Sequence, residues 1–177
     1  MSTPTEADPV KRIAGLISPD PEIIDRIIKE LESVFGPVHR VSPLLDFDKT
    51  RYYEKEMGRP LFRRFISFRD LMPQDGLPEA KLETNRLEER TSRGGMRVVN
   101  IDPGYLCLER LVLATGKNFT HRIYLKKGIF ADLTLIFHKG SFRPLEWTYP
   151  DFREPLVEGF FNELREDYRR GRIAAER

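Results

Sequence analysis

The sequence predicts a single α+β domain with a mixed, mostly antiparallel sheet, an N-terminal β-α-β unit and helices packed on the sheet. Its 177 residues suit one hydrophobic core of ordinary size. Hydrophobic residues make up 40% of the chain and charged residues 33%, which is enough to fill a core and to keep the surface hydrated. Segments with helical and with strand periodicity follow one another without a repeat or an interdomain linker, so we expect one domain.

The first part of the chain predicts the β-α-β unit. Residues 1–10 combine prolines with small and acidic residues, so a disordered tail is expected there and the domain itself over 11–170. An apolar run predicts a strand at 12–17, helical spacing predicts a helix over 21–35, and a second strand is expected at 38–41.

The middle of the chain predicts a strand between two helical segments. Residues 50–58 are expected to form one or two helical turns that end at Gly58, and 78–91 a helix with a narrow apolar stripe. In the strand predicted at 61–68, arginines occur among apolar residues on both faces. This mixture is typical of a strand near an edge or near a functional site.

The segment that follows predicts further strands. A glycine-rich turn at 93–96 precedes a strand at 97–101, which Pro103 and Gly104 are expected to break. Residues 105–115 satisfy neither periodicity well. We favour two strands with a bend there, and a short helix is the alternative.

The end of the chain predicts a hairpin and a closing helix. The hairpin pairs 121–125 with 129–137 across a Lys-Lys-Gly turn. An amphipathic helix follows over 157–168, and a basic tail is expected at 171–177.

Charge and composition exclude several classes of protein. Thirty Lys and Arg residues against 28 Asp and Glu give a formal net charge of +2, too little for extended binding to nucleic acid or to an anionic membrane. Cys107 is the only cysteine, so a disulfide framework within the chain is impossible. No secretory signal and no apolar run of about 18 residues is present, which predicts a cytoplasmic protein without a membrane partner.

Six short segments together carry a family resemblance. They are residues 52–58, 84–88, 100–106, 111–117, 121–125 and 147–151. Through them, the chain beyond its N-terminal tail resembles the bacterial domain-of-unknown-function family 4416, which has no established activity. The resemblance implies a stand-alone bacterial domain and assigns no role to these segments.

No cofactor can be assigned from a known motif. Thr115, Gly116 and Lys117 partly match a phosphate-binding loop, but the motif needs glycine at position 111 and serine or threonine at 118, where this chain has Leu and Asn. A glycine-rich dinucleotide fingerprint is absent as well. The cofactor therefore remains unknown.

Two polar clusters are candidates for a site. Lys81, Thr84 and Glu88 lie on neighbouring turns of the predicted helix with Asn85 beside them, and the alternative is a solvated flank from Lys81 to Glu88. Asn100 and Asp102 alternate onto one face at a strand end, where Asp102 is a candidate general base or simply a turn builder before Pro-Gly.

A third cluster lies near the predicted hairpin. Lys117 and Arg122 are suited to hold a phosphate or carboxylate, with Tyr124 on the face of Arg122. His121 is a candidate to move a proton, although a single strand histidine is more often structural. A metal site of His121, Asp102 and Asp132 is not favoured, because their spacing matches no short metal motif.

The clusters lead to two functional hypotheses. The first is a small-molecule-binding protein or an enzyme that acts on an anionic ligand. Its phosphate or carboxylate would be bound by Lys81, Lys117, Arg122 and Arg64. Asn85 and Asn100 would orient the ligand. The alternative is a module that binds RNA or a protein through residues 62–65 and the C-terminal arginines.

Overall fold

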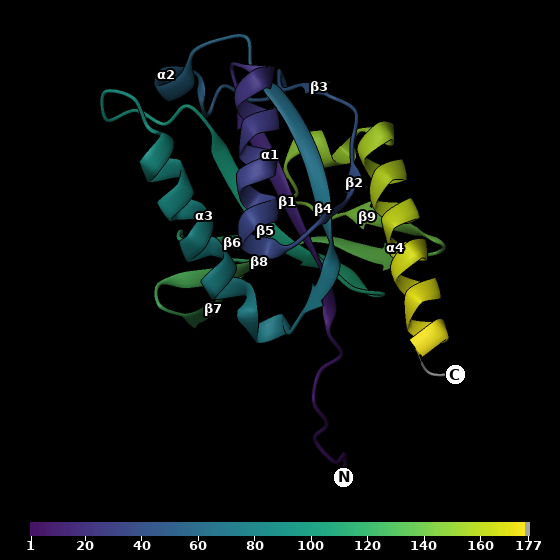
Figure 1. Cartoon of the computed structure of the whole chain (residues 1–177). Helices are drawn as coiled ribbons and strands as arrows, with labels where there is room; N and C mark the ends of the chain where they lie inside the picture. The colour runs from purple at the N-terminus through teal and green to yellow at the C-terminus, as the bar shows by residue number, and fades with distance from the viewer. Residues whose placement is uncertain (176–177) are drawn as a thin grey trace.

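The computed structural model describes residues 1–175 and shows one sheet with helices on both of its faces (Figure 1). The strands are β1 (Val10–Ser18), β2 (Val38–Val41), β3 (Leu45–Asp46), β4 (Phe62–Met72), β5 (Asn100–Leu106), β6 (Arg110–Thr115), β7 (Arg122–Lys126), β8 (Ile129–His138) and β9 (Ser141–Pro144). The helices are α1 (Pro21–Phe35), α2 (Glu54–Met57), α3 (Leu77–Thr91) and α4 (Pro155–Ala175), with short 3-10 turns η1 (Gln74–Gly76) and η2 (Pro150–Arg153).

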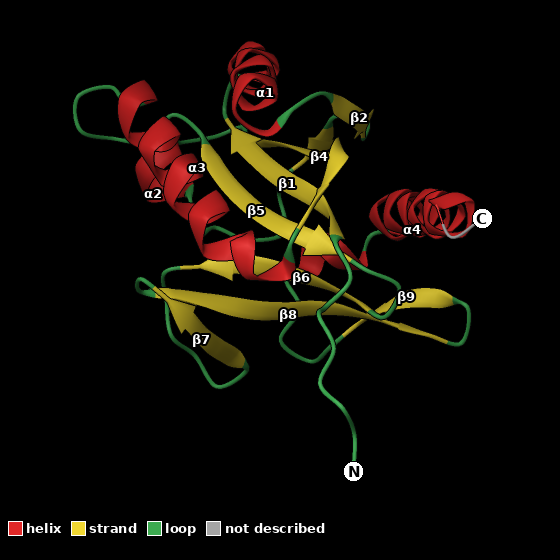
Figure 2. Ribbon diagram, turned by 60° about the horizontal axis from the view of Figure 1, so that its bottom comes forward, coloured by secondary structure: helices red, strands yellow, loops and turns green. Residues whose placement is uncertain are grey.

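The strands follow the order β2-β4-β1-β5-β6-β8-β7, with β3 paired to β4 and β9 to β8. Every pairing of neighbours is antiparallel. Since β1 and β2 both run antiparallel to β4, they are parallel to each other, and β1-α1-β2 is the predicted β-α-β unit. Figure 2 shows β1 and β5 side by side, with β6, β8 and β7 continuing the sheet. The predicted α+β class is therefore confirmed.

Apolar residues at helical spacing attach α1 and α3 to one face of the sheet. Ile24, Ile27 and Leu31 of α1 are fully or almost fully buried against Leu16 and Ile66 of the central strands. Asp20 caps α1 by accepting a hydrogen bond from the Glu22 N–H at 2.9 Å. In Figure 1, α1 and α3 lie to the left of β4 and α4 lies to the right.

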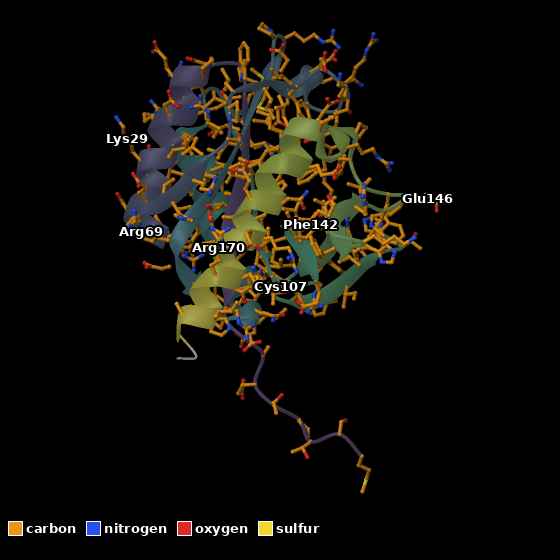
Figure 3. The ribbon with its side chains drawn as sticks, turned by 90° about the vertical axis from the view of Figure 1, so that its right-hand side faces the viewer. Lys29, Arg69, Cys107, Phe142, Glu146 and Arg170 are labelled. Carbon is orange, nitrogen blue, oxygen red and sulfur yellow. The ribbon has the colours of Figure 1, made fainter. Side chains whose placement is uncertain are left out.

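The opposite face carries α4 and a core rich in aromatic side chains. Phe161 and Leu164 of α4 are fully buried, and Phe161 makes edge contact with Phe65 of β4. Figure 3 looks at α4 from the side and labels Phe142 and Cys107, which belong to the same cluster of buried residues. None of the helices within residues 1–175 is long and apolar enough to cross a membrane.

Three predicted boundaries differ from the structure. The strand predicted at 61–68 runs from Phe62 to Met72, and it lies beside the edge strand β2, which agrees with the predicted place near an edge or a site. The closing helix continues to Ala175, so 171–175 are helical, whereas 176 and 177 lie outside the described residues. Residues 1–9 form no helix or strand, and their disorder stays a prediction.

The largest difference concerns Pro103 and Gly104, which do not end a strand. Both lie within β5, and β5 pairs with β1 on one side over its whole length. On the other side, pairing with β6 starts only at Gly104. The Cys107 N–H donates to the Arg110 carbonyl, on the side of β5 that faces β6. Because backbone groups alternate along a strand, the nitrogen of Pro103 points to the same side, where β5 has no partner strand at that position. The proline therefore costs no ladder hydrogen bond.

Gly104 marks the point where β5 and β6 begin to separate, and no larger residue fits there. A Cβ atom at this position would lie 2.4 Å from the Val112 carbonyl oxygen and 2.8 Å from a Leu113 methyl group. We expect Gly104→Ala to lower the free energy of unfolding by about 1–3 kcal/mol in urea denaturation. Gly159→Ala is the matched control, because its Cβ would meet nothing within 4 Å, and equal losses in both variants would contradict the steric account.

Candidate functional site

A cleft of about 320 Å³ opens where β5 and β6 separate. Residues of α3, β4, β5, β6, β7 and β8, position 97 and the segments at 47–53, 116–117 and 149–152 form its walls. The lining residues are Phe47, Thr50, Tyr52, Tyr53, Arg63, Lys81, Asn85, Glu88, Arg97, Asn100, Asp102, Leu113, Ala114, Thr115, Gly116, Lys117, Arg122, Asp132, Tyr149, Asp151 and Phe152. The cleft is thus rich in both charged and aromatic side chains.

Helix α3 completes the edge of β5 that β6 leaves open. Lys81 donates a hydrogen bond from Nζ to the Ile101 carbonyl at 2.8 Å, and Glu88 accepts one from the Ile101 N–H at 2.6 Å. The two side chains replace a neighbouring strand for that residue, which explains why charged groups are buried here. Burial raises the pKa of Glu88, while the positive charge of Lys81 acts in the opposite direction.

Arg97 ties this wall to α2. Its guanidinium binds Glu56 in a bidentate pair at 2.7 and 2.6 Å. It also donates to Glu88 Oε2 at 3.2 Å and to Asn100 Oδ1 at 2.9 Å. The hydrogen bond from Arg97 lowers the pKa of Glu56 and fixes α2 beside the cleft.

Arg63 lies at the base of the cleft with an exposed fraction of only 4%. Its Nη1 atom is 3.0 Å from Asp151 Oδ2, and its Nη2 atom is 3.8 Å from Asp102 Oδ2. The guanidinium also lies over the rings of Phe65 and Phe152, at 4.5 and 5.1 Å from their centroids. Gly15 of β1 provides the space, since a Cβ there would lie 2.8 Å from Nη2.

Several groups in the cleft have unused hydrogen-bonding capacity. Lys81 has three N–H donors and bonds only to the Ile101 carbonyl among residues 1–175. Asn100 Nδ2 and Arg63 Nε are buried without a partner in the same range. Neither Asp151 oxygen has a well-aligned hydrogen bond, despite its contact with Arg63. Buried polar groups are normally paired, so these point toward a bound polar molecule.

Tyrosines and Lys117 form the mouth of the cleft. The Lys117 ammonium contacts the hydroxyl of Tyr52 and lies 4.6 Å from the centre of its ring. Tyr52 packs edge to face against Tyr53, whose pKa is raised mainly by burial. The contact joins the loop after β6 to the loop before α2 across the opening.

The β8 side of the cleft presents Asp132, held by two neighbours. Asp132 Oδ2 accepts a hydrogen bond from Arg122 Nε at 2.8 Å and lies 3.2 Å from His121 Nε2. The His121 ring stacks on Trp147 with a centroid distance of 4.8 Å and an interplanar angle of 10°. His121 therefore lies behind Asp132 and positions it.

Six of the predicted site residues line this one cleft although they come from four parts of the sequence: Lys81, Asn85, Asn100, Asp102, Lys117 and Arg122. His121 reaches it only through Asp132. The remaining three lie elsewhere. Arg64 faces α1 and pairs with Asp25. Thr84 is fully buried and donates a hydrogen bond to the Lys81 carbonyl. Tyr124 packs on Phe130 with 59% of its surface exposed.

The rest of the lining consists largely of charged and aromatic residues, most of which the sequence prediction did not include among the site residues. Arg63 belonged to the strand with arginines on both faces, and the signal was present: an arginine between Leu61 and Phe65 on one strand face. Glu88, by contrast, belonged to the predicted helix cluster, since it lies seven residues after Lys81, two helical turns along the same face. Asp151 and Arg97 carry no comparable local pattern.

The arrangement suits binding and proton transfer by side chains. Among residues 1–175, no group of three or more His, Cys, Asp or Glu side chains could hold a metal ion. The partly exposed Asp102 carboxylate faces the cleft and is free to accept a proton or a hydrogen bond.

The raised pKa of Glu88 has a consequence for stability. A carboxyl group whose pKa is higher in the folded chain stabilises the fold fully below its unfolded value, near 4.5, and this contribution is lost as the pH rises through the folded pKa. Glu88→Gln keeps an oxygen acceptor for the Ile101 N–H and does not ionise. We expect urea denaturation to show that the free energy of unfolding of Glu88→Gln, relative to that of the wild type, increases between pH 4 and 7. A decrease over this range would contradict the raised pKa of Glu88.

Comparison with known proteins gives one match. The model of the family described as "Domain of unknown function (DUF4416)" matches residues 8–168, which confirms the resemblance and covers most of the chain. No curated protein and no solved structure matches. The chain therefore belongs to the DUF4416 family.

Proposed function

We propose that the cleft binds a small molecule that carries a phosphate or a carboxylate. The observation that carries this proposal is the buried Lys81 ammonium, which has unused donors, in a cleft that is also lined by Asn100, whose amide nitrogen has no partner among residues 1–175. An anionic oxygen can accept a hydrogen bond both from a buried ammonium with donors to spare and from a buried N–H group without a partner.

The charges of the lining support the same conclusion. Five cations and four carboxylates line the cleft, which leaves one positive charge in excess. Three arginines are already paired with carboxylates: Arg63 with Asp151, Arg97 with Glu88, and Arg122 with Asp132. Lys81 and Lys117 are left for a ligand, with Asp102 as the remaining acid.

The size and composition of the cleft fit a small ligand. Its volume of about 320 Å³ falls at the lower end of ordinary ligand sites, which span about 300–1,000 Å³. Phe47, Tyr53 and Phe152 supply apolar surface beside the polar groups. If the protein is an enzyme, Asp102 is the group placed to take a proton from the ligand, with Asn85 and Asn100 as orienting residues.

The proposal includes a location in the bacterial cytoplasm. The chain has a single cysteine and uses no internal disulfide, as is usual for proteins of a reducing compartment. The alternative function, a module that binds RNA or protein, finds less support. Within the segment 62–65 expected to serve it, Arg63 and Phe65 have exposed fractions of only 4% and 1%, and the exposed surface is confined to the C-terminal arginines such as Arg170.

A thermal-shift screen tests the proposal. Full-length protein is heated with sugar phosphates, nucleotides, small carboxylates and neutral sugars at constant ionic strength. An anionic compound at one hundred times its Kd should stabilise the fold by about 2.7 kcal/mol. Lys117→Met should reduce the shift, while Lys126→Met, on β7 and outside the cleft, should not. The proposal is overturned if neutral sugars shift the melting temperature as much as anionic compounds, or if both variants reduce the shift equally. Binding that disappears at moderate salt, as expected for an RNA-binding module, would also overturn it.

A further inference from the structure

We infer that the ligand is a polyol that carries the phosphate or carboxylate, and that Asp102 accepts hydrogen bonds from its hydroxyl groups. The inference rests on the proposed function and narrows the class of ligand from any small anion to a sugar phosphate or a sugar acid. Its starting point is the contrast between Asp102 and the other acids of the cleft.

Asp102 differs from the other acids of the cleft because its carboxylate has no close hydrogen-bond or ion-pair partner among residues 1–175. Glu88 and Asp132 accept hydrogen bonds at 2.6 and 2.8 Å, and Asp151 is 3.0 Å from Arg63. Among residues 1–175, the only ionic contact of Asp102 is Arg63 Nη2 at 3.8 Å, beyond hydrogen-bond range. The Asp102 side chain has an exposed fraction of 23% and faces the cleft, so its acceptor sites are available to a ligand.

The donors that suit an anion lie next to this acceptor. Asn100 and Asp102 share one face of β5, two residues apart, which separates them by roughly 6.6 Å along the strand. A deprotonated phosphate or carboxylate held by Lys81 and Asn100 offers only acceptor oxygens, and the Asp102 carboxylate also only accepts hydrogen bonds. A ligand that satisfies both ends therefore needs a hydrogen-bond donor in addition to its anionic group.

The charges around Asp102 decide which donor that is. A second anionic group on the ligand would be repelled by the Asp102 carboxylate. An ammonium group would be repelled by the Arg63 guanidinium, 3.8 Å from Asp102, and by the nearby Lys81. A hydroxyl group is neutral and donates a hydrogen bond, so it meets neither penalty.

Calorimetric titration of the full-length protein tests this inference. Inorganic phosphate, ribose 5-phosphate and gluconate are titrated into the wild type, Asp102→Asn and Asp25→Asn, the last a control acid on α1 outside the cleft. For the wild type, we expect ribose 5-phosphate or gluconate to bind at least about tenfold more tightly than inorganic phosphate. Asp102→Asn should remove most of this advantage and leave the affinity for inorganic phosphate equal or higher, whereas Asp25→Asn should change neither.

The possible outcomes separate the two proposals. A preference that Asp102→Asn abolishes supports the inference, and the preferred compound identifies the anionic group. If inorganic phosphate binds as tightly as both polyols, or if Asp102→Asn changes all three affinities by the same factor, the inference fails while the proposed function stands. If none of the three compounds binds, both fail.

Discussion

Replacing Arg63 by methionine is expected to lower the free energy of unfolding by about 3–5 kcal/mol. The substitution preserves a long apolar side chain but leaves the Asp151 carboxylate, whose side chain is only 10% exposed, without its positive partner. It also removes the guanidinium contacts with the rings of Phe65 and Phe152. Urea denaturation of the purified variant measures the loss.

Two further variants show whether the loss comes from the buried charge. Arg64→Met changes the neighbouring arginine, which pairs with the exposed Asp25, and should cost no more than about 1 kcal/mol. Adding Asp151→Asn to Arg63→Met removes the unpaired charge and should recover part of the stability. The account is wrong if Arg64→Met costs as much as Arg63→Met, or if the double variant is less stable than the single one.

The second large effect is expected for Lys81→Met, which should weaken the binding of a phosphate-bearing or carboxylate-bearing ligand by about 100-fold or more. A desolvated ammonium that bonds to an anion contributes about 2–5 kcal/mol, and each 1.4 kcal/mol is a factor of ten in Kd. The variant should also lose about 1–3 kcal/mol of stability, because the buried Ile101 carbonyl loses its hydrogen bond. Titration calorimetry measures the affinity and urea denaturation the stability.

The pH dependence of this variant provides an independent readout. The positive charge of Lys81 lowers the pKa of Glu88, so its removal should raise that pKa further. The stability of Lys81→Met should therefore decline more steeply than that of the wild type as the pH rises through the folded pKa of Glu88. Lys126→Met, an exposed lysine on β7, should leave both the affinity and the pH profile unchanged.

Much of the fold follows from local sequence patterns. The apolar spacing of α1 and its proline at the N-terminus predict that helix, and the Lys-Lys-Gly turn predicts the β7–β8 hairpin, in which Lys127 and Gly128 have positive φ values of 55° and 76°. The grouping of Lys81, Asn85, Asn100 and Asp102 also follows, because helical and strand periodicity put their polar groups on faces that apolar residues would otherwise fill.

The rest depends on pairing between distant segments. A Pro-Gly dipeptide is typical of a turn, and only the early divergence of β6 allows it within β5. The same divergence forms the cleft and exposes the Ile101 backbone to Lys81 and Glu88. Asp151 becomes a partner of Arg63 only after the last third of the chain has folded onto β4, which no local pattern encodes.

A crystal structure of the full-length protein soaked with tungstate tests the central claim most directly, because this tetrahedral anion scatters strongly and has the shape of phosphate. The account predicts an anomalous peak in the cleft within hydrogen-bonding distance of Lys81 Nζ and Asn100 Nδ2, and its absence from Lys81→Met crystals. Tungstate bound only at exposed basic residues such as Lys126 and Arg170, with the cleft free of it, would contradict the claim that the cleft is an anion site.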